Sequence, residues 1–578
     1  MKLKHIYSIL KFNILLIFCL SYDNLVLGQS TSSDFSHEDQ KIIKHLELQS
    51  GKSVSSHNAI LPFNESRIIE DINNIYTNYL NSNEDIDTSE FDRFLRSRAL
   101  FLKNHTENKY NAYSIAKKKN NFLKYFYPTA DQFYSYSNKN FYFGINPILN
   151  ISLGKEKDST ALLFKNQRGI ILTGGIDHRV YFKSRIIETQ ASYNAFENNY
   201  ILSHQSIPGA AFIKKYNSSI FKINNGYDFL IADALVNFRA TKHIDVTLGH
   251  GTHFIGNGMR SLLLSDFTTP YFYLRLNTQF WKINYQNIYA ELSPQSKFIG
   301  VADALLPKKY MAAHYLSINL LKNWNVGLFE SVIFSRKNQF ELQYLNPIIL
   351  YRSIEQSLGS PDNVLLGAHS NIQLFKKINM YGQLMLDEFV VKELLFDNKG
   401  WWANKFGIQV GLFYPDAFGV KHLDISIEHN RVRPYTYSFR DTIPSNYTHY
   451  NQELAHPLGS NFKENLLKLN YQFFNRWNIE LSVMQFSKGL DDGLLNYGGN
   501  VNRSHDDHRV MDYNNKIGQG IEQKVLNLNL GLQYELMQRM YLTLNINHRK
   551  QSLSSVTSNQ SYITTGLRWN IDQRAVEY

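Results

Sequence analysis

The 578-residue sequence predicts an all-β membrane protein, an antiparallel β-barrel of about 18 strands that follows a small N-terminal helical region. From Phe141 onward apolar residues recur at every second position, which indicates strands. The intervening positions carry mainly Asn, Gln, Gly and Thr, and the connections alternate between short and long. A soluble β-sandwich with one solvent-exposed face is the alternative, but it explains neither the uncharged polar face nor the alternation of short and long connections.

Residues 1–28 have the features of a secretory signal peptide. Three lysines within the first eleven residues precede a short apolar run, Asn13–Leu20, and small residues allow cleavage after Gly28. The run is too short to span a bilayer. The chain's one cysteine, Cys19, lies within it, so we expect a mature chain without disulfides or thiolate chemistry.

Residues 29–138 are expected to form a periplasmic helical region. Helical spacing of apolar residues occurs in Glu38–Gln49 and Glu65–Leu80, where Asn64 is a plausible N-cap, and again in Phe91–His105. Polar connections separate these three segments.

Residues 139–571 are expected to form the barrel. In Val525–Leu536 the even-numbered positions hold five leucines and a tyrosine, while the odd-numbered positions after Val525 hold Asn, Gly, Gln and Glu. Met540–Asn547 repeats this alternation, as do the segments near 406–412 and 423–428. Lipid-facing apolar residues that alternate with lumen-facing polar ones are typical of membrane barrels.

The expected strands begin near residues 141, 168, 180, 227, 245, 271, 284, 311, 325, 366, 379, 404, 422, 465, 478, 523, 540 and 561. The short connections resemble one another and are Lys242–Asp245, Lys322–Asn325, Lys376–Asn379, Asn475–Asn478 and Met537–Met540. The long ones are 336–365, 388–403, 432–464, 487–522 and 549–560. Bacterial outer-membrane barrels have short periplasmic turns and longer outer loops. Residues 572–578 are expected to form a C-terminal tail.

The formal net charge of +11 suits an anionic partner. For an exported protein this indicates lipopolysaccharide or an acidic polysaccharide. We expect no nucleic acid partner, because the sequence lacks the spacing of nucleic-acid-binding motifs.

The segment Ile244–Asp266 contains glycines that resemble phosphate-binding loops. They do not complete a Gly-x-Gly-x-x-Gly pattern, and no Gly-Lys-Ser/Thr follows. His250 and His253 would point to opposite faces of a strand, so we expect no metal there and no cofactor. We interpret the segment as a structural loop that constricts the barrel mouth, with Leu262–Leu264 packed inward. Its structural positions would be Gly249, Gly251, Gly256, Gly258 and Asp266, where Asp266 could pair with Arg260.

Polysaccharide binding needs planar rings to stack on sugars and polar groups to bond hydroxyls or carboxylates. The long loops supply both, although girdle or loop packing would equally explain the aromatic residues. Residues 348–358 have helical spacing and could fold inward as a plug or cap the pore. The candidate polysaccharide contacts are Arg260, Arg275, Tyr351, Arg352, Trp401, Trp402, Glu428, Arg433 and Tyr435.

No catalytic residues are expected. Carboxylates and histidines occur at Glu428–His429 and at His505–His508, but the latter run lies in a long polar loop. We find no nucleophile in a recognisable elbow.

Several blocks of the sequence resemble a known family. They are GHGTHFIGNGMRSLLLSD (249–266), FELQYLNPIILYRSIEQSLGSPDNVLLGAHSNIQLF (340–375), EHNRVRPYTYSF (428–439) and NQELAHPLGSNFKENL (451–466). Together they resemble the Wzi-type capsule-assembly outer-membrane proteins, and within these the RemB-type gliding-motility branch. The resemblance covers about Phe141 to Ile571. It implies an 18-stranded barrel with helical elements that block the periplasmic side, and a lectin-like role in capsule assembly or gliding adhesion.

We therefore expect a monomeric, non-enzymatic protein of the bacterial outer membrane that binds or anchors cell-surface polysaccharide. Expected partners are the polysaccharide, outer-membrane lipid and lipopolysaccharide, with export or motility machinery as further candidates. A passive porin or solute channel is the alternative, and an outer-membrane hydrolase is the third hypothesis.

Overall fold

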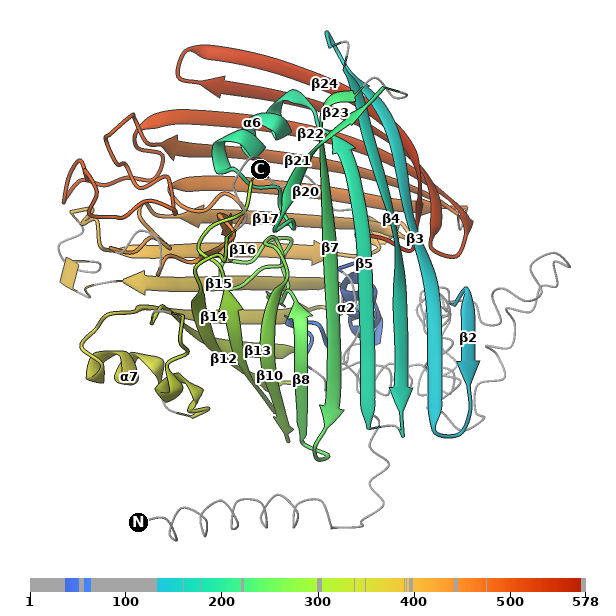
Figure 1. Cartoon of the computed structure of the whole chain (residues 1–578), viewed down its shortest axis with the longest axis horizontal. Helices are drawn as coiled ribbons and strands as arrows, with labels where there is room; N and C mark the ends of the chain where they lie inside the picture. Colours follow the sequence, from blue (N-terminus) through green and yellow to red (C-terminus); the bar gives the residue numbers. More distant parts are fainter. Residues whose placement is uncertain are drawn as a thin grey trace, which may run out of the picture.

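The computed structural model describes residues 37–50, 57–63, 132–159, 161–177, 179–219, 223–298, 304–336, 338–348, 350–388, 390, 392–393, 399–440, 445–474, 476–572 and 578. Within these residues, 18 antiparallel strands form the wall of a closed barrel (Figure 1). Each wall strand is hydrogen-bonded to its neighbours in the chain, and the last strand pairs with the first, so the wall has no free edge.

The wall strands are β3 (Phe141–Glu156), β4 (Leu162–Ile176), β5 (Val180–Ser192), β7 (Ile223–Arg239), β8 (Ile244–Gly251), β10 (Tyr271–Phe280), β11 (Ile283–Leu292), β12 (Lys309–Leu321), β13 (Trp324–Phe334), β14 (Asn363–Leu374), β15 (Ile378–Glu388), β16 (Lys405–Tyr414), β17 (Leu423–Val432), β20 (Phe462–Phe473), β21 (Trp477–Leu490), β22 (Ile521–Met537), β23 (Met540–Leu553) and β24 (Val556–Trp569). The predicted barrel is confirmed, and each of these strands begins within six residues of its expected position.

The two faces of the wall differ as predicted. On β22 and β23, Leu530, Leu542 and Ile546 are exposed on the outside, whereas Asn527 and Gln533 are buried inside. This apolar outer band and polar lumen are what a bilayer requires of a barrel. We call the two ends of the barrel the short-turn end and the long-loop end, after their connections.

Shorter elements extend or fill the barrel. β2 (Tyr134–Ser137) pairs with β3, and β6 (Ile213–Ser218) pairs with β7, so both lengthen the wall. α6 (Ala195–His204) packs with inward residues of β7 at the long-loop end, and Asn194 caps its first turn. The remaining elements are α2 (His37–Ser50), β1 (Ile60–Leu61), β9 (Phe254–Ile255), η3 (Leu342–Leu345), α7 (Tyr351–Ser357), η5 (Ala417–Gly419), β18 (Thr448–His449) and β19 (Gln452–Glu453).

Inward-folded segments fill the half of the lumen bordered by β10–β17. Leu262–Leu264 are fully buried, as expected, and lie in one apolar core with inward residues of the wall. The phenol groups of Tyr437 and Tyr447 donate to the carbonyls of Leu262 and Leu263, at 2.7 and 2.8 Å. In this half of the lumen the inward segments thus form a buried apolar core with the wall.

The N-terminal helix α2 also lies inside the barrel (Figure 1). Its Lys44 ammonium donates to the carbonyl of Asn257, and its His45 lies 2.9 Å from the Asp416 carboxylate in a short turn. β1 pairs with β9 in the same place. Residues 37–50 and 57–63 of the expected periplasmic region thus occupy the lumen near its short-turn end.

α2 confirms the helix expected at Glu38–Gln49. The helices expected at Glu65–Leu80 and Phe91–His105, and the signal peptide, lie outside the described residues. Among the helices that the structure describes, none is long and apolar enough to cross a membrane.

Candidate functional site

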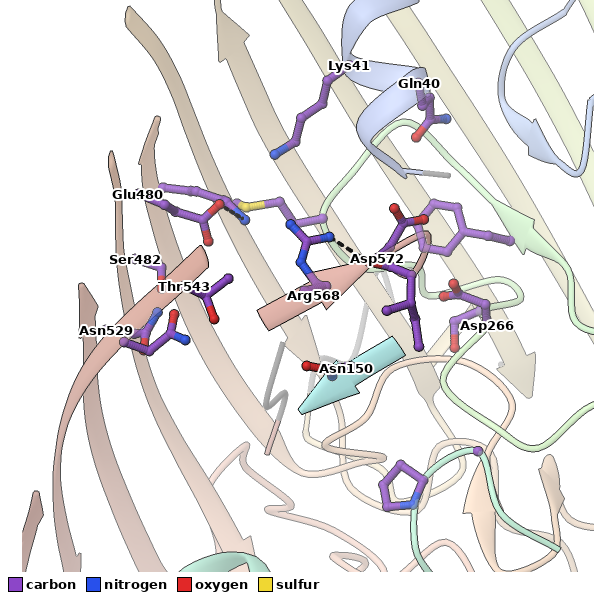
Figure 2. A pocket seen from close by; sticks show the side chains of 18 of the residues that line it. Gln40, Lys41, Asn150, Asp266, Glu480, Ser482, Asn529, Thr543, Arg568 and Asp572 are labelled. Atoms are coloured by element: carbon purple, nitrogen blue, oxygen red, sulfur yellow. Dashed lines mark hydrogen bonds and ion pairs between the residues drawn. The ribbon is translucent and has the colours of Figure 1, made fainter. Parts of the chain in front are cut away.

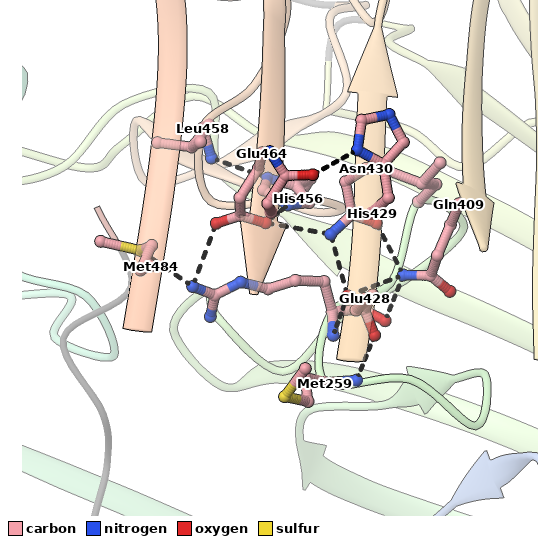
Figure 3. Close-up of polar contacts among 12 residues, drawn as sticks. Met259, Gln409, Glu428, His429, Asn430, His456, Leu458, Glu464 and Met484 are labelled. Atoms are coloured by element: carbon pink, nitrogen blue, oxygen red, sulfur yellow. Dashed lines mark hydrogen bonds and ion pairs between the residues drawn. The ribbon is translucent and has the colours of Figure 1, made fainter. Parts of the chain in front are cut away.

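A buried network in the lumen centres on Glu428 of β17 (Figure 3). Its carboxylate accepts the backbone N–H groups of Met259 at 2.6 Å and Arg260 at 3.1 Å. It also accepts the Tyr381 hydroxyl at 2.9 Å and the Asn430 amide at 2.8 Å. Glu428 therefore fixes the turn at residues 258–260 to the barrel wall.

The same network continues to Glu464 of β20. The Arg260 guanidinium lies 3.4 Å from the Glu464 carboxylate, which also accepts the Asn430 amide at 2.9 Å. His456, in the loop before β20, contacts the same carboxylate at 2.8 Å, and burial lowers the pKa of this histidine. Arg260, which was expected to be available for pairing, thus contacts the carboxylate of Glu464.

His456 and Glu464 are the kind of pair that the hydrolase hypothesis required. Both side chains are fully buried among protein partners, with Arg260 beside them. These contacts join the loop before β20 to the turn at residues 258–260, so the pair helps to hold the inward loops together. Among the described residues, no group of three or more His, Cys, Asp or Glu side chains is placed to hold a metal ion.

Arg275 of β10 lies apart from this network. It is buried and donates to the carbonyl of Pro62 at 2.9 Å, with Thr247 at 3.5 Å. Arg275 thus secures the segment that carries β1. Sequence reasoning could not find this role, since Pro62 lies in a different part of the chain.

The glycines of the 249–258 segment have different neighbours. A Cβ at Gly249 would lie 2.7 Å from the Tyr273 hydroxyl, and one at Gly258 would lie 2.5 Å from a Glu428 oxygen. At Gly251 the nearest atom would be a Tyr273 ring carbon at 3.7 Å, an ordinary contact. The space that a side chain at residue 249 would need is therefore occupied by the end of the Tyr273 side chain. Gly256 has φ +144°, which favours glycine.

A cavity of about 820 Å³ occupies the other part of the lumen (Figure 2). Inward residues of β3–β7 and β20–β24 line it, and α2 and Asp266 border it. The lining is rich in amides and hydroxyls, including Asn150, Gln167, Asn529, Thr543, Asn545 and Thr564.

Most charged groups in the cavity wall have partners. Arg185 lies 2.6 Å from Asp233, and Lys468 lies 2.7 Å from Glu480. Arg568 donates to the side chain of Gln533 at 3.0 Å. The space therefore presents mainly neutral hydrogen-bonding groups, which suit hydroxyl-rich ligands.

Four of the predicted contacts come together at the long-loop end. The rings of Trp401 and Trp402 lie 6.2 Å apart, and the Tyr435 ring meets Trp402 edge-on at 6.1 Å. Arg433 donates to the carbonyls of Asn404 at 2.6 Å and Trp401 at 3.0 Å. We call Trp401, Trp402, Arg433 and Tyr435 the aromatic cluster.

Sequence reasoning missed a member of this site. The Arg509 guanidinium stacks 3.9 Å above the Trp402 ring and pairs with Asp506 at 2.8 Å. The His505 ring lies 4.8 Å from Trp402. The run His505–His508, which sequence analysis assigned to solvent, therefore begins within this site. Tyr435 is buried, while Trp401 and Trp402 are half-buried.

Tyr351 and Arg352 lie elsewhere. Residues 348–358 were expected to fold into or over the pore, and this expectation is wrong. α7 packs against outward-facing residues of β12 and β13, with the Tyr351 ring 4.0 Å from that of His314. α7 lies outside the barrel because the outward-facing residues of the wall at this place are polar and bind it.

Comparison with solved structures shows a shared fold. Wzi, described as an outer-membrane protein involved in group 1 capsule assembly in Escherichia coli and a carbohydrate-binding β-barrel, aligns with a TM-score of 0.53 at 9% identity. The alignment covers 94% of this chain and 100% of Wzi. OccK8 (OprE) and OprD of Pseudomonas aeruginosa align over 74% of this chain, and over 97% and 94% of their own chains, at 9% identity with TM-scores of 0.39 and 0.38. No protein-family model and no curated protein matches the sequence.

The closed 18-stranded barrel, with its apolar outer band and polar lumen, identifies the chain as a bacterial outer-membrane protein. Its long-loop end then faces the outside of the cell, as in other barrels of this membrane. By the same general rule we expect the aromatic cluster on the outer side and α2 on the periplasmic side of the lumen.

Proposed function

We propose that this protein binds or anchors cell-surface polysaccharide and catalyses no reaction. The observation that carries this proposal is the cavity of about 820 Å³, whose wall is rich in amides and hydroxyls with its charges largely paired. Sugar hydroxyls donate and accept hydrogen bonds, so neutral amides and hydroxyls match them without leaving buried charges unpaired.

The aromatic cluster supports the same proposal from the outer end. Indole rings offer apolar faces to sugar rings, and Arg433 and Arg509 supply donors for hydroxyls or carboxylates. The net charge of +11 favours an acidic polymer. Among the other predicted contacts, we assign Arg260, Arg275 and Glu428 to positioning the inward loops.

The likeness to Wzi covers nearly the whole chain, which supports a Wzi-type role. Within this proposal the polymer is held either for capsule assembly or as an adhesive surface during gliding. Lipopolysaccharide and export or motility machinery are the further partners we propose, with the protein acting as a monomer.

The experiment that tests binding uses the purified protein reconstituted in liposomes and the native surface polysaccharide of the same cells. We expect co-sedimentation with the polysaccharide, and loss of retained surface polysaccharide in a deletion strain. Unchanged surface polysaccharide in the deletion strain, together with no co-sedimentation, would contradict the proposal.

A solute channel is the second candidate, favoured by the length of the cavity. Its lining includes Asn478, next to the short-turn end of β21, and Glu197 of α6 at the long-loop end. Planar-bilayer recording separates the two functions. A large steady current would support the channel, and its absence with polysaccharide binding intact would support the binding protein.

A further inference from the structure

The outer face of the wall carries polar residues on β11–β13 where a membrane barrel should be apolar. On β11 the outward positions include Tyr285 and Asn287, and on β12 and β13 they include His314 and Glu330. Their inward neighbours, such as Tyr315 and Phe329, lie in the luminal core. Charged or polar residues on the lipid face of a barrel are destabilising, most of all near mid-membrane.

These positions are at the level of the apolar band. Asn287 is four residues from Ile283, where β11 begins at the short-turn end. On other strands, Leu248 and Ile427 are also four residues from the short-turn end, and both are exposed on the outside. Antiparallel strands of similar tilt rise at similar rates, so the three residues lie at comparable depth.

A segment from the long connection between β13 and β14 covers these polar residues. We call residues 339–348 and 350–362 the outer flap; it contains η3 and α7, and α7 lies outside the ring of wall strands (Figure 1). Its Pro347 carbonyl accepts the Tyr285 hydroxyl at 2.5 Å and the Asn287 amide at 3.2 Å. Its Leu345 carbonyl accepts the Tyr289 hydroxyl at 3.0 Å.

Side chains and the start of α7 complete the contact. The backbone N–H of Arg352 donates to the Glu330 carboxylate at 3.0 Å, and the Tyr351 ring lies on His314. Phe334 of the wall packs with Phe340 at 5.0 Å and Tyr344 at 4.8 Å. The segment is also tied at its end, where Asp362 lies 2.6 Å from Arg336. The outer flap therefore covers these polar residues and gives Tyr285, Asn287, Tyr289 and Glu330 hydrogen-bond partners that lipid would not supply.

The part of the outer flap before α7 exposes large apolar side chains, whereas the exposed residues of α7 are the polar Arg352, Ser353, Gln356 and Ser357. Ile348 is 82% exposed, Leu342 72% and Leu350 63%. The wall next to the flap continues this apolar surface with Leu328, which is 55% exposed on β13, and with Leu366 on β14. Large apolar side chains that adjoin a lipid-facing band have a ready partner in the lipid acyl chains.

We propose that the outer flap is seated in the outer leaflet, with Leu342, Ile348 and Leu350 in contact with lipid acyl chains and its other side sealed to the polar wall of β11–β13. It makes a lipid contact outside the cylinder of the barrel, and this inference is independent of polysaccharide binding. The apolar residues of the flap face the lipid where the wall itself is polar, and the flap does not close the pore.

The test uses a fluorescent probe on a single introduced cysteine, since the sequence after Cys19 contains no other. The variant Ile348→Cys is compared, in liposomes, with Leu328→Cys on the lipid-facing wall and Leu494→Cys in a long outer loop, where Leu494 is 73% exposed. Folding of each variant is checked by its heat-modifiable electrophoretic mobility.

We expect nitroxide attached to lipid tails to quench the probe at Ile348→Cys about as strongly as at Leu328→Cys, and iodide in the buffer to quench only the probe at Leu494→Cys. Quenching of the Ile348→Cys probe by iodide and not by lipid nitroxide would overturn the proposal. Protection from both quenchers would also overturn it, in favour of a contact with a second copy of the chain. A further variant, Ile354→Cys, should resist labelling because this residue is buried between α7 and the wall.

Discussion

The Glu428 carboxylate on β17 accepts the backbone N–H of Met259 at 2.6 Å, although 169 residues separate the two. This bond joins the barrel wall to the segment that fills half of the lumen. Neutralising or removing the carboxylate should therefore destabilise the segments inside the lumen while the barrel strands stay paired.

Glu428→Leu should lower the stability of the folded barrel more than Glu428→Gln. Leucine leaves the N–H groups of Met259 and Arg260 and the Tyr381 hydroxyl without their acceptor, and each unsatisfied buried group costs about 1–3 kcal/mol. Glutamine keeps an acceptor oxygen. Urea unfolding followed by tryptophan fluorescence measures this, with exposed Glu522→Leu as the control. Equal midpoints for Glu428→Leu and Glu522→Leu would contradict the assigned role.

Gly258→Ala should destabilise the protein, and Gly251→Ala should do so much less. The added Cβ at residue 258 would lie 2.5 Å from a Glu428 oxygen and 2.8 Å from the Arg260 carbonyl, whereas at residue 251 it meets an ordinary contact at 3.7 Å. Overpacking of this kind costs about 1–3 kcal/mol. The two urea midpoints give the comparison, and a larger loss for Gly251→Ala would show that the turn at 258–260 is loosely held.

Docking of α2 should strengthen with pH. Burial lowers the pKa of Lys44 to about 7, mainly by desolvation, while a released lysine keeps its proton up to its usual pKa of 10.5. The released state therefore binds more protons between these values, so docking gains stability as pH rises from about 7 towards 10.5 and is independent of this group below 7.

Lys44→Met should remove that dependence. Protease protection of residues 37–50 at pH 7 and pH 9, measured as the fraction docked, should rise with pH in the parent and stay level in the variant. A parent protein with the same docked fraction at both pH values would refute the assignment to Lys44.

Trp402→Ala should weaken polysaccharide retention, since it removes the ring that Arg509 and Tyr435 contact. Loss of a stacking aromatic residue at a binding site costs about 1–3 kcal/mol, or about 5- to 150-fold in affinity. Trp281→Ala, at the short-turn end and highly exposed, is the matched control. Similar binding by both variants would place the polymer away from the aromatic cluster.

The wall could be predicted from the sequence because lipid on one side and a polar lumen on the other impose a period of two on every strand. The filling of the lumen could not, because contacts such as Arg260 with Glu464 join distant segments and leave no local pattern. The block 249–266 did indicate an inward loop through its glycines and Leu262–Leu264, but not which wall residues hold it.

The position of the outer flap was predicted wrongly for a related reason. Helical spacing in residues 348–358 predicts an apolar face but not which side of the wall receives it. A usable signal was present in β13, where Glu330 falls among the outward positions between Leu328 and Val332. A carboxylate in that register predicts that protein, not lipid, covers the wall there.

The central claim is that this barrel binds surface polysaccharide, and the most direct measurement is co-sedimentation of the native polymer with the protein in liposomes. We predict saturable binding by the parent protein that Trp402→Ala weakens and Trp281→Ala leaves unchanged. A parent protein that retains no more polymer than empty liposomes would contradict the claim.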